Sequence, residues 1–385
     1  MSKDIRETFL QLVRLGIGHT DSTDSTELSD WRALKALAEK QGLSAVVLDG
    51  LNDVRSKRSD VRCSSLQEKI LLAEWIGEVH QFYEQRYELY LQAISSLAAF
   101  YNSHGFKMMV LKGYACSLDW PKPNHRPCGD IDIWLFGKQK EADAALEVWF
   151  KSLSGSTRSP SVQEFKIDSS HHHHTVFDWQ GFMVENHYDF INVHHHKSHK
   201  ELELILKELG KDDTHYVELN GDTSTGSAAK VYLPSPNLHA LFLMKHLMLH
   251  FSTGEINLRQ LLDWGFFVRM HGKDVDWEKI EKVYEQFNMK TLYGIFNAIC
   301  VDELGFDASE FHFVRFEPAL KKRVFNDIMC PEFSGKTPSS LLPRLFFKFR
   351  RWKANEWKHK LCYKDSMWSA FWSGVWGHLL KPASI

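Results

Sequence analysis

The chain has 385 residues, enough for two or three domains, and its 43% apolar and 25% charged residues are typical of a globular protein rather than a disordered one. A net charge of −2 gives the whole molecule no strong attraction to nucleic acid or membranes, so any such preference must be local. The six cysteines include no C-x-x-C pair, which argues against a zinc ribbon or a disulfide framework.

The amino-terminal segment "MSKDIRETFLQLVRLGIG" carries charges inside its apolar pattern and has no signal-peptide core. The sequence also contains no run of about 18 or more uncharged apolar residues, the length that a membrane-spanning helix requires. We therefore expect a cytoplasmic protein without a membrane span.

Residues 1–104 are expected to form a helical region. "DIRETFLQLVRLG" and "DSTELSDWRALKALAEKQG" have apolar residues at helical spacing and end on glycine, and the second begins with capping residues. Residues 65–103 contain a long amphipathic stretch, from Leu66 to about Tyr101.

The helical spacing of apolar residues ends at "GFKMMVLKG", where residues 107–111 form a short apolar run typical of a buried strand. A short helix ("YACSLDW"), a strand within "RPCGDIDIWLF" and a helix ("GKQKEADAALEVWF") follow. Next come a Ser-rich loop at 151–161 and β-like runs near 163–168, 172–178 and 182–191. Helices alternating with strands, then strands in succession, predict an α+β domain over residues 105–235.

Residues 236–385 are again expected to be helical, with helical spacing in "NLHALFLMKHLMLHF", "NLRQLLDWGFFVRM" and "DWEKIEKVYEQF". Within this region, residues 344–364 interleave Lys and Arg with Phe and Trp. Such a segment could bind nucleic acid or an anionic membrane. We favour the alternative that its aromatic side chains pack on the helices while its Lys and Arg side chains face water.

Two carboxylates stand out in "RPCGDIDIWLF". Because the side-chain period of a strand is two, Asp130 and Asp132 share one face, while Ile131 and Ile133 share the other. The isoleucine face suits packing on helices. The two carboxylates would lie about 7 Å apart at the backbone, close enough to share divalent ions.

The same alternation places Glu185, His187 and Asp189 on one face of "FMVENHYDF". If this strand lies beside the first, Glu185 adds a third carboxylate. Three carboxylates are suited to a two-metal phosphoryl-transfer site, where the ions offset the triphosphate charge and activate a hydroxyl.

A turn at Lys112 and Gly113 follows the first predicted strand. Glycine lets the backbone approach phosphates closely, and Lys112 supplies a nearby cation. Arg126, four residues before Asp130, is a candidate for clamping a phosphate through both of its terminal donors.

The order of strand, "LKG", short helix, "R-x-x-GDIDI" and later "VENHYDF" resembles the nucleotidyltransferase superfamily that includes DNA polymerase beta. More closely, it resembles the uncharacterised bacterial nucleotidyltransferase family. That family shows a Lys-Gly turn, an Arg, a Gly-Asp-hydrophobic-Asp strand and a Val-Glu-x-His strand. "NLRQLLDW", with Arg259 and Asp263, is similar to the Leu-Arg-x-x-Leu-Asp element of its helical half. The resemblance covers most of the chain.

The resemblance implies a polymerase-beta-like mixed sheet between helical regions. It also implies a Mg²⁺-dependent enzyme (two ions, with Mn²⁺ as an alternative) that transfers a nucleoside monophosphate from an NTP, ATP first, to a hydroxyl acceptor. Asp130 and Asp132 would hold the ions, and Glu185 would be the third ligand or the base. The nucleotide-binding residues would be Lys112, Gly113, Arg126, Gly129 and His187.

Several alternatives stay open. The acceptor is a protein side chain, a small molecule or an RNA end. The same scaffold also suits a nucleotide-binding or partner-binding module with little turnover. The histidine runs at 171–174 and 194–199 either reach the nucleotide or serve as ordinary imidazoles, and we favour the second reading because alternation splits the first run between two faces.

Overall fold

The computed structural model of the chain describes residues 3–19, 30–57, 65–154, 165–194, 196–220, 228–333, 338–370 and 372. Internal contacts divide the chain into two compact units, each built from segments far apart in sequence. The helical unit comprises Met1–Arg86, Ser117–Pro127 and Leu243–Lys364, and the sheet unit comprises Tyr87–Cys116, Cys128–Phe242 and Asp365–Ile385. The three-part division at residues 104 and 235 stays a prediction.

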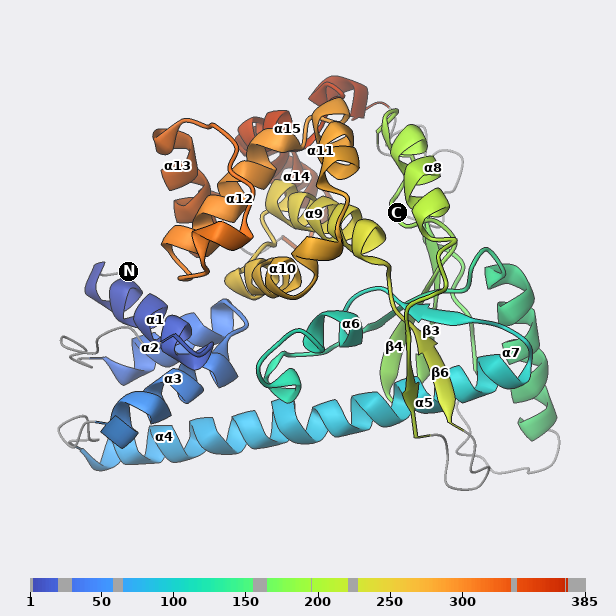
Figure 1. Ribbon diagram of the computed structural model, residues 1–385, viewed down its shortest axis with the longest axis horizontal. Coiled ribbons are helices and arrows are strands. Elements are labelled where there is room, and N and C mark those ends of the chain that lie inside the picture. The colour runs from blue at the N-terminus through green and yellow to red at the C-terminus, as the bar shows by residue number, and fades with distance from the viewer. Residues whose placement is uncertain are drawn as a thin grey trace. The chain divides into compact units, whose positions relative to one another are not determined.

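The sheet unit holds one mixed sheet in the order β3-β4-β2-β1-β6-β5 (Figure 1). Strands β2 and β4 are parallel, as are β1 and β6, and the other neighbours are antiparallel. The strands are β1 (Met108–Val110), β2 (Ile131–Trp134), β3 (His174–Trp179), β4 (Phe182–His187), β5 (Tyr216–Leu219) and β6 (Ala229–Tyr232). The helices are α5 (Arg86–Ser103), α6 (Tyr114–Ser117), α7 (Gln139–Ser154) and α8 (His199–Leu209). This mixed sheet with its helices confirms the α+β class.

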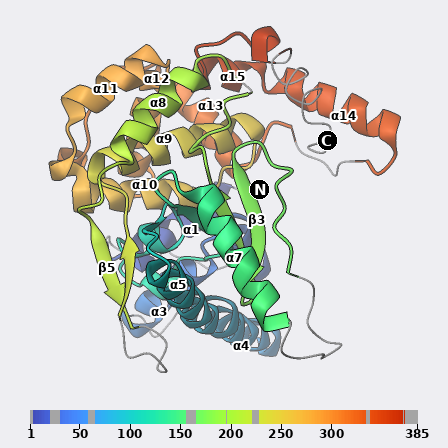
Figure 2. The same ribbon diagram turned by 90° about the vertical axis from the view of Figure 1, so that its right-hand side faces the viewer.

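The core of the sheet unit lies on one face of the sheet. Helices α5 and α7 (Figure 2) both contribute to a single apolar cluster with the strands. Ile131 and Ile133 belong to this cluster and are fully buried, as the alternation in β2 predicted. The aspartate face of β2 is consequently turned to the opposite side of the sheet.

The hairpin of β3 and β4 sets the register of the sheet edge. Its two-residue turn, Gln180 and Gly181, has positive φ at both positions (53° and 81°), the backbone of a type I′ turn. The pairing runs from Trp179 opposite Phe182 at the turn to His174 opposite His187 at the far end.

The helical unit surrounds large aromatic side chains. Trp264 of α10 is fully buried and donates from Nε1 to Asn297 Oδ1 of α12 at 2.8 Å. Its helices are α1 (Lys3–Gly16), α2 (Trp31–Lys40), α3 (Ser44–Lys57), α4 (Leu66–Val79), the π-helix η1 (His80–Gln85), η2 (Pro123–His125), α9 (Pro236–Thr253, beginning in the sheet unit), α10 (Leu258–His271), η3 (Gly272–Asp274), α11 (Trp277–Gln286), α12 (Lys290–Asp302), η4 (Ala308–Glu310), α13 (Pro318–Met329), α14 (Leu341–Ala354) and α15 (Glu356–Cys362).

The helices expected from apolar spacing are confirmed. The stretch from residue 66 to about 101 is helical throughout as α4, η1 and α5, and the capping box of Ser65 and Glu68 begins it. Helix α3 was not singled out in the sequence. Its first five residues, Ser44 to Leu48, are all buried, and its exposed polar residues lie in its second half.

Two strand-region expectations were wrong. Part of the Ser-rich loop expected at 151–161 is helical, because α7 continues to Ser154; residues 155–161 lie outside the described residues. Within the described part of the run at 163–168, the only pairing is an isolated bridge between Asp168 and Val176.

The basic carboxy-terminal segment departs from the packing that we expected. Phe346 and Phe349 of α14 are exposed (64% and 53%), whereas Lys358 of α15 is buried and forms a 2.5 Å ion pair with Asp327. The expectation of buried aromatics and solvated charges is therefore wrong for these residues. No helix in the described part of the chain is both long and apolar enough to cross a membrane.

Candidate functional site

The carboxylates of β2 and β4 lie side by side. In the parallel pairing of these strands, Asp132 stands opposite Glu185 and Trp134 opposite His187. Asp130 directly precedes β2 and is half-buried, whereas the Asp132 side chain is only 1% exposed. The structure thus brings the Asp132 and Glu185 side chains together, with Asp130 directly before β2.

Two cationic side chains surround Asp132. Lys112 Nζ lies 2.7 Å from Asp132 Oδ1, and His187 Nε2 donates to the same oxygen at 3.1 Å. His187 Nε2 also lies 3.6 Å from Glu185 Oε2, and its Nδ1 donates to the Asp189 carbonyl at 3.2 Å. Lys112, Asp132, His187 and Glu185 therefore form a compact, largely buried cluster in which positive and negative side chains alternate. Each charge is stabilised by the opposite charge beside it.

These contacts move the pKa values in opposite directions. Burial alone would raise the pKa of Asp132, but the charges of Lys112 and His187 outweigh it and hold that pKa well below its usual range. Burial works to lower the pKa of His187, yet its hydrogen bonds to Asp132 and Glu185 raise it to about 9. At neutral pH Asp132 is therefore ionised and His187 protonated.

Asp130 behaves differently from Asp132. Burial, followed by repulsion from Asp132, raises the pKa of Asp130, and the charge of Lys112 offsets only part of this rise. Burial also works to raise the pKa of Glu185, but the hydrogen bond from His187 lowers it overall. The three carboxylates therefore differ in their affinity for protons, although they share one face.

Gly113 occupies a turn that only glycine fits. Its φ is +54°, a left-handed conformation that residues with a Cβ atom rarely adopt. A Cβ atom at this position would lie 2.2 Å from the Tyr90 hydroxyl, which donates to the Asp130 carbonyl at 2.9 Å. The turn thus packs against the backbone that presents Asp130.

Arg126 makes a different contact from the one that its proposed role requires. Its Nε and Nη2 donate to the two carboxylate oxygens of Asp263 at 2.7 and 2.8 Å, and both side chains are buried. Trp120 Nε1 also donates to Asp263, at 2.9 Å. Phosphate binding by Arg126 stays a prediction.

The nucleotide-binding roles of Gly129 and Lys112 also stay predictions. Gly129 is exposed, and a Cβ atom there would contact nothing within 4 Å, so crowding does not require glycine. Lys112 points at Asp132. Burial lowers its pKa, but Asp132 and then Asp130 more than compensate and raise it, so that it remains charged.

Part of the first histidine run lies near the carboxylates, with His174 Nδ1 3.9 Å from Glu185 Oε2, and whether it reaches a nucleotide stays a prediction. His174 of β3 is buried opposite His187, and potential ligand atoms of His173, His174 and His187 lie within 4.8 Å of one another. Burial is the main reason that the pKa of His174 falls to about 4. The two-residue turn signal, Gln180 and Gly181, was the feature that could have predicted this placement. His199 of the second run begins α8.

The donor set fits a divalent cation. One ligand atom from each of Asp132, Glu185 and His187 lies within 4.8 Å of the others, and Asp130 directly precedes β2. Carboxylate oxygens are the donors that Mg²⁺ prefers. Mn²⁺ also accepts an imidazole nitrogen, which would require His187 to give up the Nε2 proton that it shares with Asp132.

The sequence model of a family described as uncharacterised nucleotidyltransferase matches residues 27–304. The match therefore takes in all six strands of the sheet and the helices from α2 to α12. No match was found among curated proteins or among solved structures.

Proposed function

The chain belongs to the uncharacterised nucleotidyltransferase family, and we propose that it transfers a nucleoside monophosphate from an NTP, ATP being the first candidate, to a hydroxyl acceptor. The observation that carries this proposal is the pairing of Asp132 with Glu185 beside Asp130. The mixed sheet with carboxylates on two adjacent strands supports a polymerase-beta-like architecture as part of the same proposal.

Asp130, Asp132 and Glu185 are the side chains that would hold Mg²⁺ or Mn²⁺ at this face. Such ions would offset the charge of the triphosphate and make the acceptor hydroxyl easier to deprotonate. Lys112 and His187 are paired with Asp132. Once a metal ion takes their place at this carboxylate, their positive charges would be available to a negatively charged substrate.

The reaction exchanges one bond at the α-phosphorus for another. The acceptor oxygen forms a bond to the α-phosphorus, the bond from that phosphorus to the bridging oxygen of the β-phosphate breaks, and pyrophosphate leaves. The hydroxyl proton passes to a carboxylate, for which Glu185 is the candidate if it is not the third ligand. The backbone of the Gly113 turn is the candidate for holding the phosphates, and the Tyr90 hydroxyl occupies the place that a Cβ atom would take there.

The test distinguishes nucleotidyl transfer from phosphoryl transfer and from simple binding. The protein, Mg²⁺ and a cell extract would be incubated with ATP labelled either at the α- or at the γ-phosphate. We expect the α-label alone to enter an acceptor and to need Asp132. Entry of the γ-label alone, or binding without transfer to any fraction of the extract, would contradict the proposal.

A further inference from the structure

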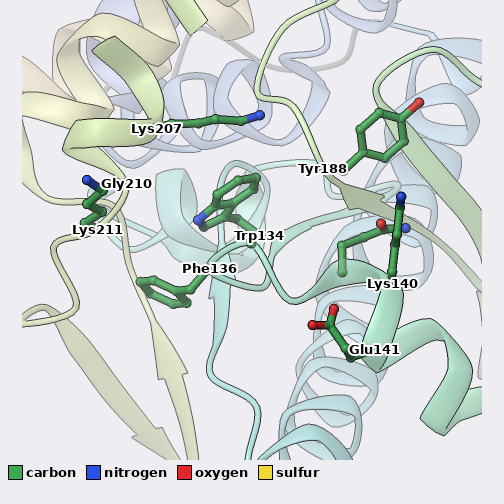
Figure 3. A pocket seen from close by; sticks show the side chains of 10 residues that line it. Trp134, Phe136, Lys140, Glu141, Tyr188, Lys207, Gly210 and Lys211 are labelled. Carbon is green, nitrogen blue, oxygen red and sulfur yellow. The ribbon is translucent and has the colours of Figure 1, made fainter. Parts of the chain in front are cut away.

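A pocket of about 700 Å³ opens on the sheet unit where β2 ends (Figure 3). This volume falls within the range of small-molecule sites. The lining comes from the end of β2, the start of α7, the residue after β4 and the end of α8. Its main side chains are Trp134, Phe136, Lys140, Tyr188, Lys207 and Lys211.

Trp134 brings an unused donor to this pocket. The side chain is only 5% exposed, and its ring lies 4.5 Å from that of Phe190. Its buried Nε1 donates to no acceptor within the described residues. In Figure 3 this nitrogen points to the side of the pocket where Phe136 and Lys211 lie. Buried donors are nearly always paired, so the orphan N–H favours an occupant that carries a hydrogen-bond acceptor.

The charge of the lining favours an anion. Three lysines and one acidic residue, Glu141, line the pocket. Lys207 is paired with Asp189, and Lys211 with Glu208. Lys140 is exposed and makes no ion pair within the described residues, which leaves its charge available for a ligand.

The pocket and the glycine turn lie at opposite ends of β2. Strand β1 is antiparallel to β2, with Val110 opposite Ile133, so the turn at Gly113 lies near the start of β2. Trp134 is at the end of the strand and follows Asp132 on the same face. Attacking and leaving oxygens must lie on opposite sides of the phosphorus in an in-line displacement. With the triphosphate toward Gly113, the attacking hydroxyl comes from the end that the pocket occupies.

We propose that this pocket binds the acceptor, and that the acceptor is a small hydroxyl-bearing molecule with a phosphate or carboxylate group. This inference rests on the proposed function. The aromatic lining contacts the body of the molecule, and the Trp134 N–H and Lys140 bind its anionic group.

The experiment measures binding to the full chain by isothermal titration, with phenyl phosphate as the anionic probe, phenylacetate as the carboxylate probe and benzyl alcohol as the uncharged comparison. The variants are Trp134→Phe, which removes only the N–H and retains a ring, and Lys140→Gln. Lys138→Gln is the matched control, because Lys138 is exposed on the same turn, pairs with Glu141 and does not line the pocket.

We expect at least one anionic probe, but not benzyl alcohol, to bind the unaltered protein and the Lys138→Gln control equally. Trp134→Phe and Lys140→Gln should each weaken that binding roughly tenfold. Because Lys140 is exposed, its variant is not expected to disturb folding. Absence of binding by both probes, or equal binding by all variants, would overturn the proposal.

A second titration, with Mg²⁺ and the non-hydrolysable analogue α,β-methylene-ATP, separates this inference from the proposed function. We expect Trp134→Phe and Lys140→Gln to bind the analogue normally. If these variants lose the analogue instead, the pocket belongs to the nucleotide site and the acceptor proposal fails, although the proposed function stands. If the unaltered protein binds the anionic probe but never the analogue, the proposed function fails.

Discussion

Asp132 of β2 and Glu185 of β4 stand directly opposite each other on adjacent parallel strands. Lys112 and His187 both contact Asp132, and His187 also lies 3.6 Å from Glu185. Positive and negative side chains therefore alternate through the cluster. An ordinary solvated strand face would not bury Asp132 to 1% exposure. The burial and the two cations indicate a site built around this carboxylate.

Replacing Asp132 by asparagine should destabilise the protein as well as weaken ion binding. The change leaves Lys112 and His187 buried without their counter-ion, and breaking a buried pair typically costs about 3–5 kcal/mol. Urea unfolding measures the loss. Glu147→Gln on α7 is the control, because its ion pair with Lys151 is exposed and should contribute less than about 1 kcal/mol. Equal stability of the two variants would contradict the tight coupling of this cluster.

Gly113→Ala should destabilise the protein by about 2–4 kcal/mol, through its positive φ and through the clash with the Tyr90 hydroxyl. Gly137→Ala measures the cost of the positive φ alone, since φ is also positive at Gly137 (+79°) but a Cβ atom there would meet nothing within 4 Å. Adding Tyr90→Phe to Gly113→Ala should recover part of the difference. Thermal unfolding of the four proteins checks this, and an equal loss for both glycines would exclude the clash.

The sequence was informative about the carboxylate strands because alternation in "GDIDIWLF" and "VENHYDF" fixes the face of each side chain. It was less informative where partners are distant. Lys112 was assigned to phosphate, yet it contacts Asp132, and Arg126 has its partner 137 residues away. Such contacts depend on tertiary packing, which no local pattern encodes.

Strands β5 and β6 were missed for a related reason. Along β5 the side chains alternate between exposed and half-buried, and β6 has only four residues. Neither run is apolar or long enough to stand out from a loop. The position of His174 beside His187 was not predicted, because it depends on the register of the hairpin.

The buried pair of Arg126 and Asp263 should act as a stability element. Arg126→Met leaves the Asp263 carboxylate unpaired and should lower the free energy of unfolding by about 3–5 kcal/mol. The double variant Arg126→Met with Asp263→Leu should regain most of it, as a double-mutant cycle would show. A single variant that weakened only the binding of α,β-methylene-ATP would instead support the phosphate role expected from the sequence.

Glu203 of α8 should make stability fall as the pH rises toward neutrality. Its carboxylate accepts from the Phe190 and Ile191 amides, but burial raises its pKa to about 7. Between the unfolded value of 4.5 and about 7, the folded state holds a proton that the unfolded state has lost. Stability therefore decreases by up to about 1.4 kcal/mol per pH unit in this window and levels off above it.

The Glu203→Gln variant provides the control for this pH dependence. Glutamine retains an acceptor oxygen but cannot ionise. Urea unfolding at pH 5 and pH 8 should show the variant gaining stability relative to the unaltered protein at the higher pH. A difference that does not change with pH would contradict the raised pKa.

The most direct test of the carboxylate site is titration of Mg²⁺ with α,β-methylene-ATP into four proteins by calorimetry. These are the unaltered chain, Asp130→Asn, Asp132→Asn and the surface control Glu147→Gln, each checked for folding by circular dichroism. We predict that the unaltered chain and the control bind alike, that chelation of Mg²⁺ abolishes binding, and that both aspartate variants bind at least about tenfold more weakly. Equal binding by all four folded proteins would contradict the assignment of Asp130 and Asp132 as the residues that hold the metal and nucleotide.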